Sequence, residues 1–457
     1  MNVCLLLPSF NIPFFGDDFA WLLQSQELKE FSFIKFICLP APFDYFRPLP
    51  KLFFLVFGSL FDSDFIFFRI AVVLLHVSCA ILLFKLSSAL KYSKETAFIA
   101  AIIFSVLSCH SEALFFINCI NELFSAFFIL TGLYLFCEFR SVKKDVIIIV
   151  SFLLALMSRE SAVCFFPMLL LINYKSVKRS LKEVLVISFV PLMLYLSFRI
   201  FSETYFGESN IVPIMESLDL NPAKVVYKLL HYFISMIFPV KMLFEFAGYG
   251  TLEFLIHAFR KPAENLPVFL TLAFTVSLIC FSVFYFFIRT LKKEIVFPVM
   301  LILISLAVYL FSFNTAERFL YLPSAGLSIL LALFFQNLSF KRTALIILLL
   351  FIFVHSSSLV FRAYRHRQAA EYSERVMRDL YNRTVEVKAG SKILFENIPP
   401  KQFGIFFLSV FNFQSNWDYN YPNRKINFLF KETINQSDKP DLIYDFNAGN
   451  SEFKKIR

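Results

Sequence analysis

The sequence predicts an all-α polytopic membrane protein that ends in a small C-terminal α/β domain. Hydrophobic residues make up 58% of the 457 residues, and 65 residues are phenylalanine. The mean hydropathy is +0.68. No globular interior buries that much apolar surface, so a water-soluble protein is excluded. Apolar segments recur as far as about residue 361 and polar residues dominate afterwards, which divides the chain into a transmembrane domain (1–361) and a tail (362–457).

The apolar segments predict about eleven transmembrane helices. Residues 1–15 are apolar but fall short of the roughly 20 residues that a helix needs to cross a bilayer, so they count as an incomplete first helix. Three regions are apolar except for a polar centre, and each is counted as two helices. They are residues 97–137, 146–172 and 295–336. The single spans are residues 65–90, 184–201, 266–288 and 343–361.

Flanking charge indicates that each of the three regions with a polar centre is a hairpin of two helices. Lysine and arginine clusters lie on both sides of each region, for example Lys91 and Lys94 before the first and Arg140, Lys143 and Lys144 after it. Such clusters belong in the cytoplasm, and only an even number of crossings returns the chain to the same side. The three polar centres therefore point outward together. An odd total of eleven helices places the tail outside as well.

Two outer loops are expected to carry helices that lie along the membrane interface. The first loop, residues 16–64, has a half-apolar stretch at about 51–61. The second loop, residues 202–265, has one at 225–238. Both stretches predict interfacial helices rather than further spans.

The tail is expected to be an extracytoplasmic α/β domain. Residues 368–381 predict a helix, and residues 391–398 and 404–413 have the composition of strands. The net charge of +10 comes from short basic clusters between apolar segments. Membrane topology explains these clusters, so we expect no nucleic-acid partner.

Asp17 and Asp18 stand side by side after Gly16, at the edge of an apolar segment. Two carboxylates there are costly to desolvate and need water, a cation or a reacting group beside them. In the second hairpin the apolar arms around Arg159 and Glu160 are too short for full crossings. This pair must therefore lie below the membrane surface, in a cavity walled by protein. We interpret the Asp pair as the reaction centre.

One face of the protein thus collects ionisable side chains from distant parts of the sequence. They are Asp17, Asp18, Arg47, His110, Glu112, Arg159, Glu160, Glu317 and Arg318. An arginine guanidinium matches phosphate oxygens, and a carboxylate takes a proton from an attacking hydroxyl. The set suits group transfer from a lipid phosphate.

Each of these side chains also has a structural interpretation. The Asp pair could cap a helix, Arg159 and Glu160 could be an ion pair, as could Glu317 and Arg318, and a buried histidine could bond a backbone carbonyl. A flippase or transporter of a lipid-linked saccharide is the alternative function. It predicts charged residues at both leaflets and symmetric repeats, whereas the polar centres here fall on one face.

Five segments occur in the order found in one known family. They are Gly16-Asp17-Asp18-Phe19, Tyr45-Phe46-Arg47-Pro48-Leu49, His110-Ser111-Glu112, Ser158-Arg159-Glu160-Ser161-Ala162 and Ala316-Glu317-Arg318-Phe319-Leu320-Tyr321-Leu322-Pro323-Ser324. Over residues 14–361 the chain resembles the membrane part of GT-C glycosyltransferases. It is most similar to the protein O-mannosyltransferase-like group whose eukaryotic members append tetratricopeptide repeats. The chain lacks these repeats, and Asn121 stands where relatives commonly have arginine.

The resemblance implies an inverting hexosyl or mannosyl transferase. Its donor would be a polyprenyl-phosphate sugar and its acceptor a hydroxyl of a protein, glycan or lipid. Asp17 or Asp18 would be the base, and both are candidates for holding a divalent cation, Mg²⁺ or Mn²⁺, because hard cations prefer carboxylate oxygen.

The resemblance also assigns the remaining candidates to substrate binding. Arg47, Arg159 and Arg318 would contact the donor phosphate, His110 and Glu112 would shape the sugar pocket, and Tyr321 would add a hydroxyl or a stacking face. Glu160 and Glu317 accompany these arginines in the sequence. Heavy Phe and Lys usage is typical of an AT-rich genome, which favours a bacterial inner membrane with the site facing the periplasm.

Overall fold

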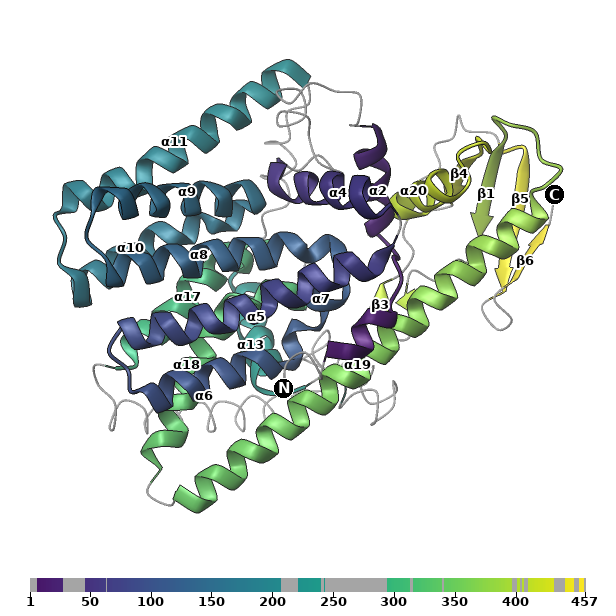
Figure 1. Ribbon diagram of the computed structural model, residues 1–457. Coiled ribbons are helices and arrows are strands. Elements are labelled where there is room, and N and C mark those ends of the chain that lie inside the picture. Colours follow the sequence, from purple (N-terminus) through teal and green to yellow (C-terminus); the bar gives the residue numbers. More distant parts are fainter. Residues whose placement is uncertain are drawn as a thin grey trace.

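The computed structural model describes residues 6–27, 46–62, 64–206, 221–239, 242, 294–312, 315–338, 341–396, 401–402, 405–406, 410–430, 440–447 and 452–455. A helical bundle forms most of the molecule, and a small sheet lies at the far end of the longest helix (Figure 1). The bundle helices are α5 (Phe65–Ala89), α6 (Lys94–Val106), α8 (Ile120–Glu138), α9 (Val142–Ser158), α10 (Phe165–Ile172), α11 (Leu181–Phe206), α17 (Val296–Leu310), α18 (Pro323–Asn337) and α19 (Lys341–Arg383).

Apolar faces hold these helices together in an order that differs from their order in the sequence. Helix α8 packs between α5 and α9, while α18 packs against both α17 and α6. Gly326 allows α18 to approach α17 closely, because a Cβ at this position would lie 2.5 Å from the carbonyl oxygen of Pro298. The first and third predicted hairpins therefore share one interface inside the bundle.

The number of spans is lower in the described residues than the sequence predicts. Four helices there are long and apolar enough to cross a membrane, or five if α6 and the bent segment Ser108–Phe115 form one span. Helices α10, α17 and α18 are shorter. The span expected at 266–288 lies outside the described residues. The eleven-helix prediction is therefore not confirmed.

Leu6 is helical, but the first expected helix does not continue as an α-helix over residues 7–15. The chain there makes only the short 3-10 helix η1 (Leu7–Asn11) and then continues in extended form. Pro8 and Pro13 explain this, because a proline inside an α-helix removes a hydrogen bond and clashes with the preceding turn. Residues 1–5 lie outside the described residues, so the incomplete first helix stays a prediction for that part of the chain.

Each hairpin centre forms a polar turn between two helices. The first turn contains η4 (Ser108–His110), α7 (Ser111–Phe115) and η5 (Ile117–Cys119), the second η6 (Glu160–Cys164), and the third η8 (Glu317–Leu320). Helix α13 (Pro222–Ile237) packs against η4, η8 and α17. The three turns are thus neighbours at one end of the bundle.

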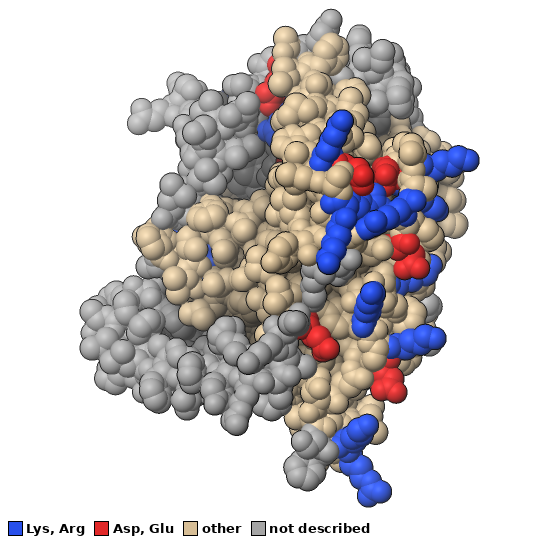
Figure 2. Space-filling view, turned by 90° about the vertical axis from the view of Figure 1, so that its left-hand side faces the viewer, with Lys and Arg blue, Asp and Glu red and all other residues tan. Residues whose placement is uncertain are grey.

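The opposite end of the bundle carries the basic clusters. The connections from α5 to α6, from α8 to α9 and from α10 through η7 (Asn173–Val177) to α11 lie on the left-hand side of Figure 1. Lys and Arg side chains gather on this face, with a few acidic ones among them (Figure 2). Several of the basic clusters that separate apolar segments in the sequence thus lie at one end of the bundle.

The first loop lies at the end that holds the polar turns. It contributes α2 (Asp18–Glu27) and α4 (Pro48–Phe61), which pack on each other and on α20 and α9 respectively. Trp21 of α2 stacks on Phe54 of α4, with ring centroids 5.5 Å apart. Helix α4 begins three residues before the predicted interfacial stretch because Pro48 occupies its first turn, where a missing N–H costs nothing.

The helix predicted at 368–381 is confirmed as the last part of α19, which continues from the preceding apolar segment without a break. The strand predicted at 391–398 is confirmed at Lys392–Glu396. Strands β1 (Lys392–Glu396), β4 (Asn427–Phe430) and β5 (Leu442–Asn447) are parallel, and β6 (Glu452–Lys455) is antiparallel to β5, in the order β4-β1-β5-β6. A two-stranded ladder joins β2 (Lys401–Gln402) to β3 (Ile405–Phe406).

The second predicted strand of the tail, 404–413, is only partly a strand. After β3 the chain forms α20 (Val410–Asn420), which packs on β4. Phe413 and Trp417 of α20 are fully buried, and both rings contact Phe428 of β4. Burial at helical spacing against the sheet overrides the strand-like composition of this stretch.

Candidate active site

The turn that carries the two aspartates is shaped by Gly16 and by backbone N–H groups. Gly16 has φ +60°, a left-handed conformation that glycine adopts at little cost. Asp18 is 0% exposed. Its Oδ1 accepts the backbone N–H of Asn118 at 2.8 Å, and its Oδ2 accepts that of Phe15 at 3.3 Å. Asp18 therefore fastens the first loop to the first polar turn.

Asp17 has a different environment from its neighbour. Its side chain is partly exposed, and its Oδ2 accepts the side-chain amide of Asn118 at 3.4 Å. The two aspartates were interchangeable in the sequence. In the structure Asp18 supports the backbone, while Asp17 presents a carboxylate at the surface of the turn.

The sequence reasoning missed Arg69, a fully buried residue of α5. Its guanidinium donates to the carbonyl oxygens of Ile12 at 3.1 Å, Pro13 at 3.3 Å and Phe115 at 2.8 Å. These bonds join the segment before Gly16 to the first polar turn. A lone arginine within a 25-residue apolar helix was the signal that could have revealed it.

Burial raises the pKa of Asp18 from its ordinary value of 3.8 to about 7. The positive charge of Arg69 and the two backbone N–H groups act in the opposite direction. The desolvation of a fully enclosed carboxylate is thus only partly offset. At neutral pH the residue is divided between its charged and neutral forms.

Arg47 links the first loop to the second polar turn. Its Nη2 and Nε lie 3.1 Å and 3.3 Å from Oε2 of Glu160. Arg159, next in sequence to Glu160, pairs instead with Glu122 of α8. The predicted alternative of an Arg159–Glu160 pair is therefore replaced by two ion pairs, each of which joins separate elements.

Arg159 and the third polar turn meet through aromatic rings. The guanidinium of Arg159 lies 5.2 Å from the ring centroid of Tyr309 and 5.0 Å from that of Phe319. Both rings are stacked, with centroids 4.4 Å apart. A cation over such faces is stabilised by their quadrupoles.

Glu112 and Glu317 connect the first and third turns. Oε2 of Glu112 accepts the backbone N–H of Arg318 at 3.3 Å, and Oε2 of Glu317 accepts the hydroxyl of Ser111 at 3.0 Å. The Nη1 of Arg318 lies 3.8 Å from the sulfur of Cys119. Among the residues that the structure describes, the guanidinium of Arg318 has no carboxylate oxygen within 4 Å, in contrast to those of Arg47 and Arg159.

His110 and Tyr321 lie inside the bundle rather than at its surface. Both are buried, and their ring centroids are 4.7 Å apart. Nε2 of His110 contacts the hydroxyl of Ser324 at 2.7 Å, and the hydroxyl of Tyr321 contacts Nδ1 of His76 at 2.8 Å. These hydrogen bonds connect α18 and the residues just before it to α5 and to the first polar turn.

The two aspartates do not by themselves form a metal site. Both oxygens of Asp18 already accept backbone N–H groups. Within the described ranges no three His, Cys, Asp or Glu side chains come close enough to hold a metal ion. The divalent cation therefore stays a prediction. Chelation followed by readdition of Mg²⁺ or Mn²⁺ remains the test of that prediction.

Four or five of the described helices are long and apolar enough to cross a membrane, so the protein is an integral membrane protein, and its fold is similar to that of two solved proteins. Sequence comparison matches no family profile and no curated protein. Structure comparison finds ArnT from Cupriavidus metallidurans bound to undecaprenyl phosphate, at 12% identity and a TM-score of 0.57, over 97% of this chain and 91% of that one. The Archaeoglobus fulgidus oligosaccharyltransferase in complex with Zn and sulfate matches at 13% identity and a TM-score of 0.52, over 93% of this chain and 62% of that one.

Proposed function

We propose that this protein is a membrane glycosyltransferase that moves one sugar from a polyprenyl-phosphate donor to an acceptor hydroxyl. One observation carries the proposal: ion pairs and hydrogen bonds of charged side chains connect the first loop and all three polar turns at one end of the bundle. The links are Arg47–Glu160, Arg159–Glu122, Glu112 to Arg318, and Asn118 to both aspartates. The fold shared with ArnT, which was solved bound to undecaprenyl phosphate, supports the choice of donor.

Asp17 is the proposed base, because Asp18 is committed to backbone N–H groups. The carboxylate of Asp17 accepts the proton of the acceptor hydroxyl, and the hydroxyl oxygen attacks the anomeric carbon. The bond from that carbon to the phosphate oxygen breaks, and its electron pair stays on the phosphate. Attack opposite the leaving group inverts the anomeric configuration. The products are the glycoside, polyprenyl phosphate and a protonated Asp17.

Arg318 is the proposed ligand of the departing phosphate. Arg47 and Arg159 are already paired with Glu160 and Glu122, so they hold the turns in place. Arg318 has no such partner in the described part of the chain, and Glu112 positions it through its backbone N–H. A guanidinium in a partly dry site stabilises charge that develops on a phosphate oxygen.

The finer parts of the proposal concern the sugar and the side of the membrane. We take the donor sugar to be a hexose of the mannose type, as in the O-mannosyltransferase-like group. The site faces away from the cytoplasm in this proposal, because the basic clusters lie at the opposite end of the bundle. A bacterial inner membrane with a periplasmic site fits that orientation.

The test uses purified protein in nanodiscs with a radiolabelled polyprenyl-phosphate hexose. We expect label to leave the lipid with formation of polyprenyl phosphate, and Asp17→Asn to abolish this release. Glu95→Gln is the matched control, since Glu95 is an exposed carboxylate in the first turn of α6, at the basic end. Movement of the intact headgroup across the bilayer without bond cleavage would favour the flippase instead.

A further inference from the structure

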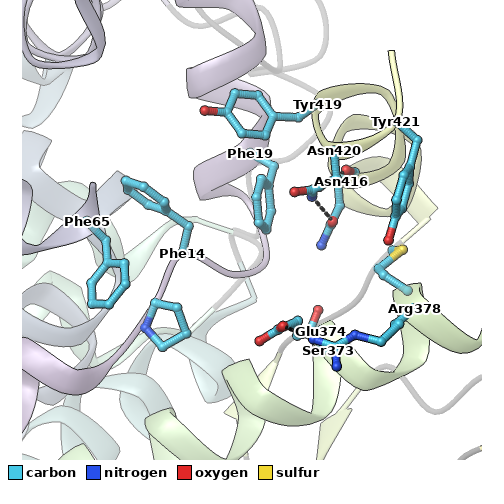
Figure 3. Close-up of a pocket in the computed structure, with 12 residues that line it drawn as sticks. Phe14, Phe19, Phe65, Ser373, Glu374, Arg378, Asn416, Tyr419, Asn420 and Tyr421 are labelled. Carbon is cyan, nitrogen blue, oxygen red and sulfur yellow. Dashed lines mark hydrogen bonds and ion pairs between the residues drawn. The ribbon is translucent and has the colours of Figure 1, made fainter. Parts of the chain in front are cut away.

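A second candidate site lies where the first loop meets the tail. A pocket of about 300 Å³ opens between α2, the middle of α19 and α20 (Figure 3). Phe14 and Phe19, which flank the Gly16-Asp17-Asp18 turn, form one wall. Tail residues Asn416, Tyr419, Asn420 and Tyr421 form the opposite wall, and Ser373, Glu374 and Arg378 of α19 form the floor. A volume of this size is at the lower end of the range for small-ligand sites, about 300–1,000 Å³.

The pocket combines flat aromatic faces with amide groups. The ring of Phe19 lies 5.6 Å from that of Tyr419, and the ring of Tyr421 lies 4.7 Å from that of the buried Trp417. Nδ2 of Asn420 donates to Oδ1 of Asn416 at 2.8 Å. Aromatic faces accept the C–H face of a sugar ring, while amides exchange hydrogen bonds with its hydroxyls.

One buried polar group in the lining, the hydroxyl of Ser373, has no hydrogen-bond partner among the described residues. Ser373 is 2% exposed, and its Oγ makes no hydrogen bond there. Asn416 is 3% exposed, and its Oδ1 accepts the side-chain amide of Asn420. An unsatisfied buried polar group costs free energy, so a ligand that forms a hydrogen bond with the Ser373 hydroxyl recovers it.

The charge of the pocket excludes an anion as its best ligand. Its two charged residues, Glu374 and Arg378, form an ion pair at 2.5 Å, so their net charge is zero. A hydrocarbon chain would leave the amides and Ser373 unpaired. A neutral polyhydroxylated ring with one apolar face satisfies both the aromatic and the polar lining.

We propose that this pocket binds a neutral sugar ring of a glycan, and that this glycan is the acceptor. The second half of the statement rests on the proposed function. It follows from position, since Phe14 and Phe19 directly flank the turn that carries Asp17. A ring held here places a neighbouring hydroxyl of the same glycan beside the proposed base.

Tryptophan fluorescence measures binding without any transfer reaction. The protein has two tryptophans, and Trp21→Phe leaves Trp417 as the reporter on α20. The full chain in nanodiscs is titrated with neutral hexoses, N-acetylhexosamines and short oligosaccharides. We expect a saturable change in emission with at least one neutral saccharide.

Two variants decide whether the binding occurs in this pocket. Ser373→Ala and Asn416→Leu each remove hydrogen bonds to the ligand and are expected to weaken binding about 3–10-fold. Ser373→Ala also removes an unsatisfied hydroxyl, so its thermal midpoint should not fall. Asp418→Asn on the same helix is the control, because Asp418 does not line the pocket and asparagine can still accept from Gln414. Binding by this control should be unchanged.

The outcomes separate this proposal from the proposed function. Saccharide binding without donor cleavage would support the pocket and overturn the transferase. Donor cleavage without a Trp417 response to any saccharide, a response only to peptides or phosphate, or equal affinity in all three variants would overturn the pocket assignment.

Discussion

The contrast between Asp17→Asn and Asp18→Asn tests the central assignment most directly. Asp17 is partly exposed and contacts the amide of Asn118 at 3.4 Å, a weak bond. Its replacement should change the free energy of unfolding by less than about 0.5 kcal/mol. Loss of a general base should lower kcat about 10²–10⁴-fold.

The same substitution at Asp18 should act on stability instead. The carboxylate of Asp18 accepts two backbone N–H groups, one on each oxygen, whereas an asparagine side chain has only one oxygen. The backbone N–H of Phe15 or of Asn118 therefore loses its acceptor and lies against the NH₂ group of the asparagine. An unsatisfied buried donor costs about 1–3 kcal/mol. Arg69 remains bonded to three carbonyl oxygens, which limits the cost of removing its charged neighbour.

The assay pairs label release with thermal unfolding in detergent. We expect Asp17→Asn to keep the wild-type midpoint and lose turnover, and Asp18→Asn to lower the midpoint. Full turnover in Asp17→Asn would refute its role as base. A large drop in its midpoint together with native stability of Asp18→Asn would show that the two roles are reversed.

Three further predictions follow from the same geometry. Arg318→Met should lower kcat/KM for the donor about 10²–10³-fold, and Arg318→Lys should lower it by a smaller factor. Equal kcat/KM in wild type and both variants would contradict the role of Arg318 at the phosphate. Gly16→Ala should cost about 1–2 kcal/mol of stability because φ is +60°, which denaturant titration measures; a cost near zero would mean that the turn relaxes. The pKa of Asp18 is raised to about 7 in the folded state, so the folded protein binds this proton more tightly than the unfolded chain does. The stability gained from binding the proton is therefore complete below about pH 4 and is lost as the pH rises to 7. The slope of midpoint against pH in that window should therefore be more negative in wild type than in Asp18→Asn, and identical slopes would argue against the shift.

Much of the bundle was predictable because hydropathy and flanking charge act locally. The spans at α5, α8 and α11 follow from long, mostly apolar stretches, and the polar turns follow from basic residues on both sides of each hairpin. The prediction failed where distant contacts decide the conformation. Helix α20 replaced a predicted strand because Phe413 and Trp417 are buried against β4.

The sequence by itself determined that this protein lies in a membrane and that its charged turns share one end. The free energy of inserting a segment into the membrane depends on that segment's own residues, and its orientation depends on the basic residues beside it. It did not distinguish Asp17 from Asp18, which are identical in chemistry and adjacent in the chain. Only the tertiary structure decided between them. The N–H groups of Asn118 and Phe15 and the guanidinium of Arg69 surround one carboxylate, and the other is left at the surface of the turn.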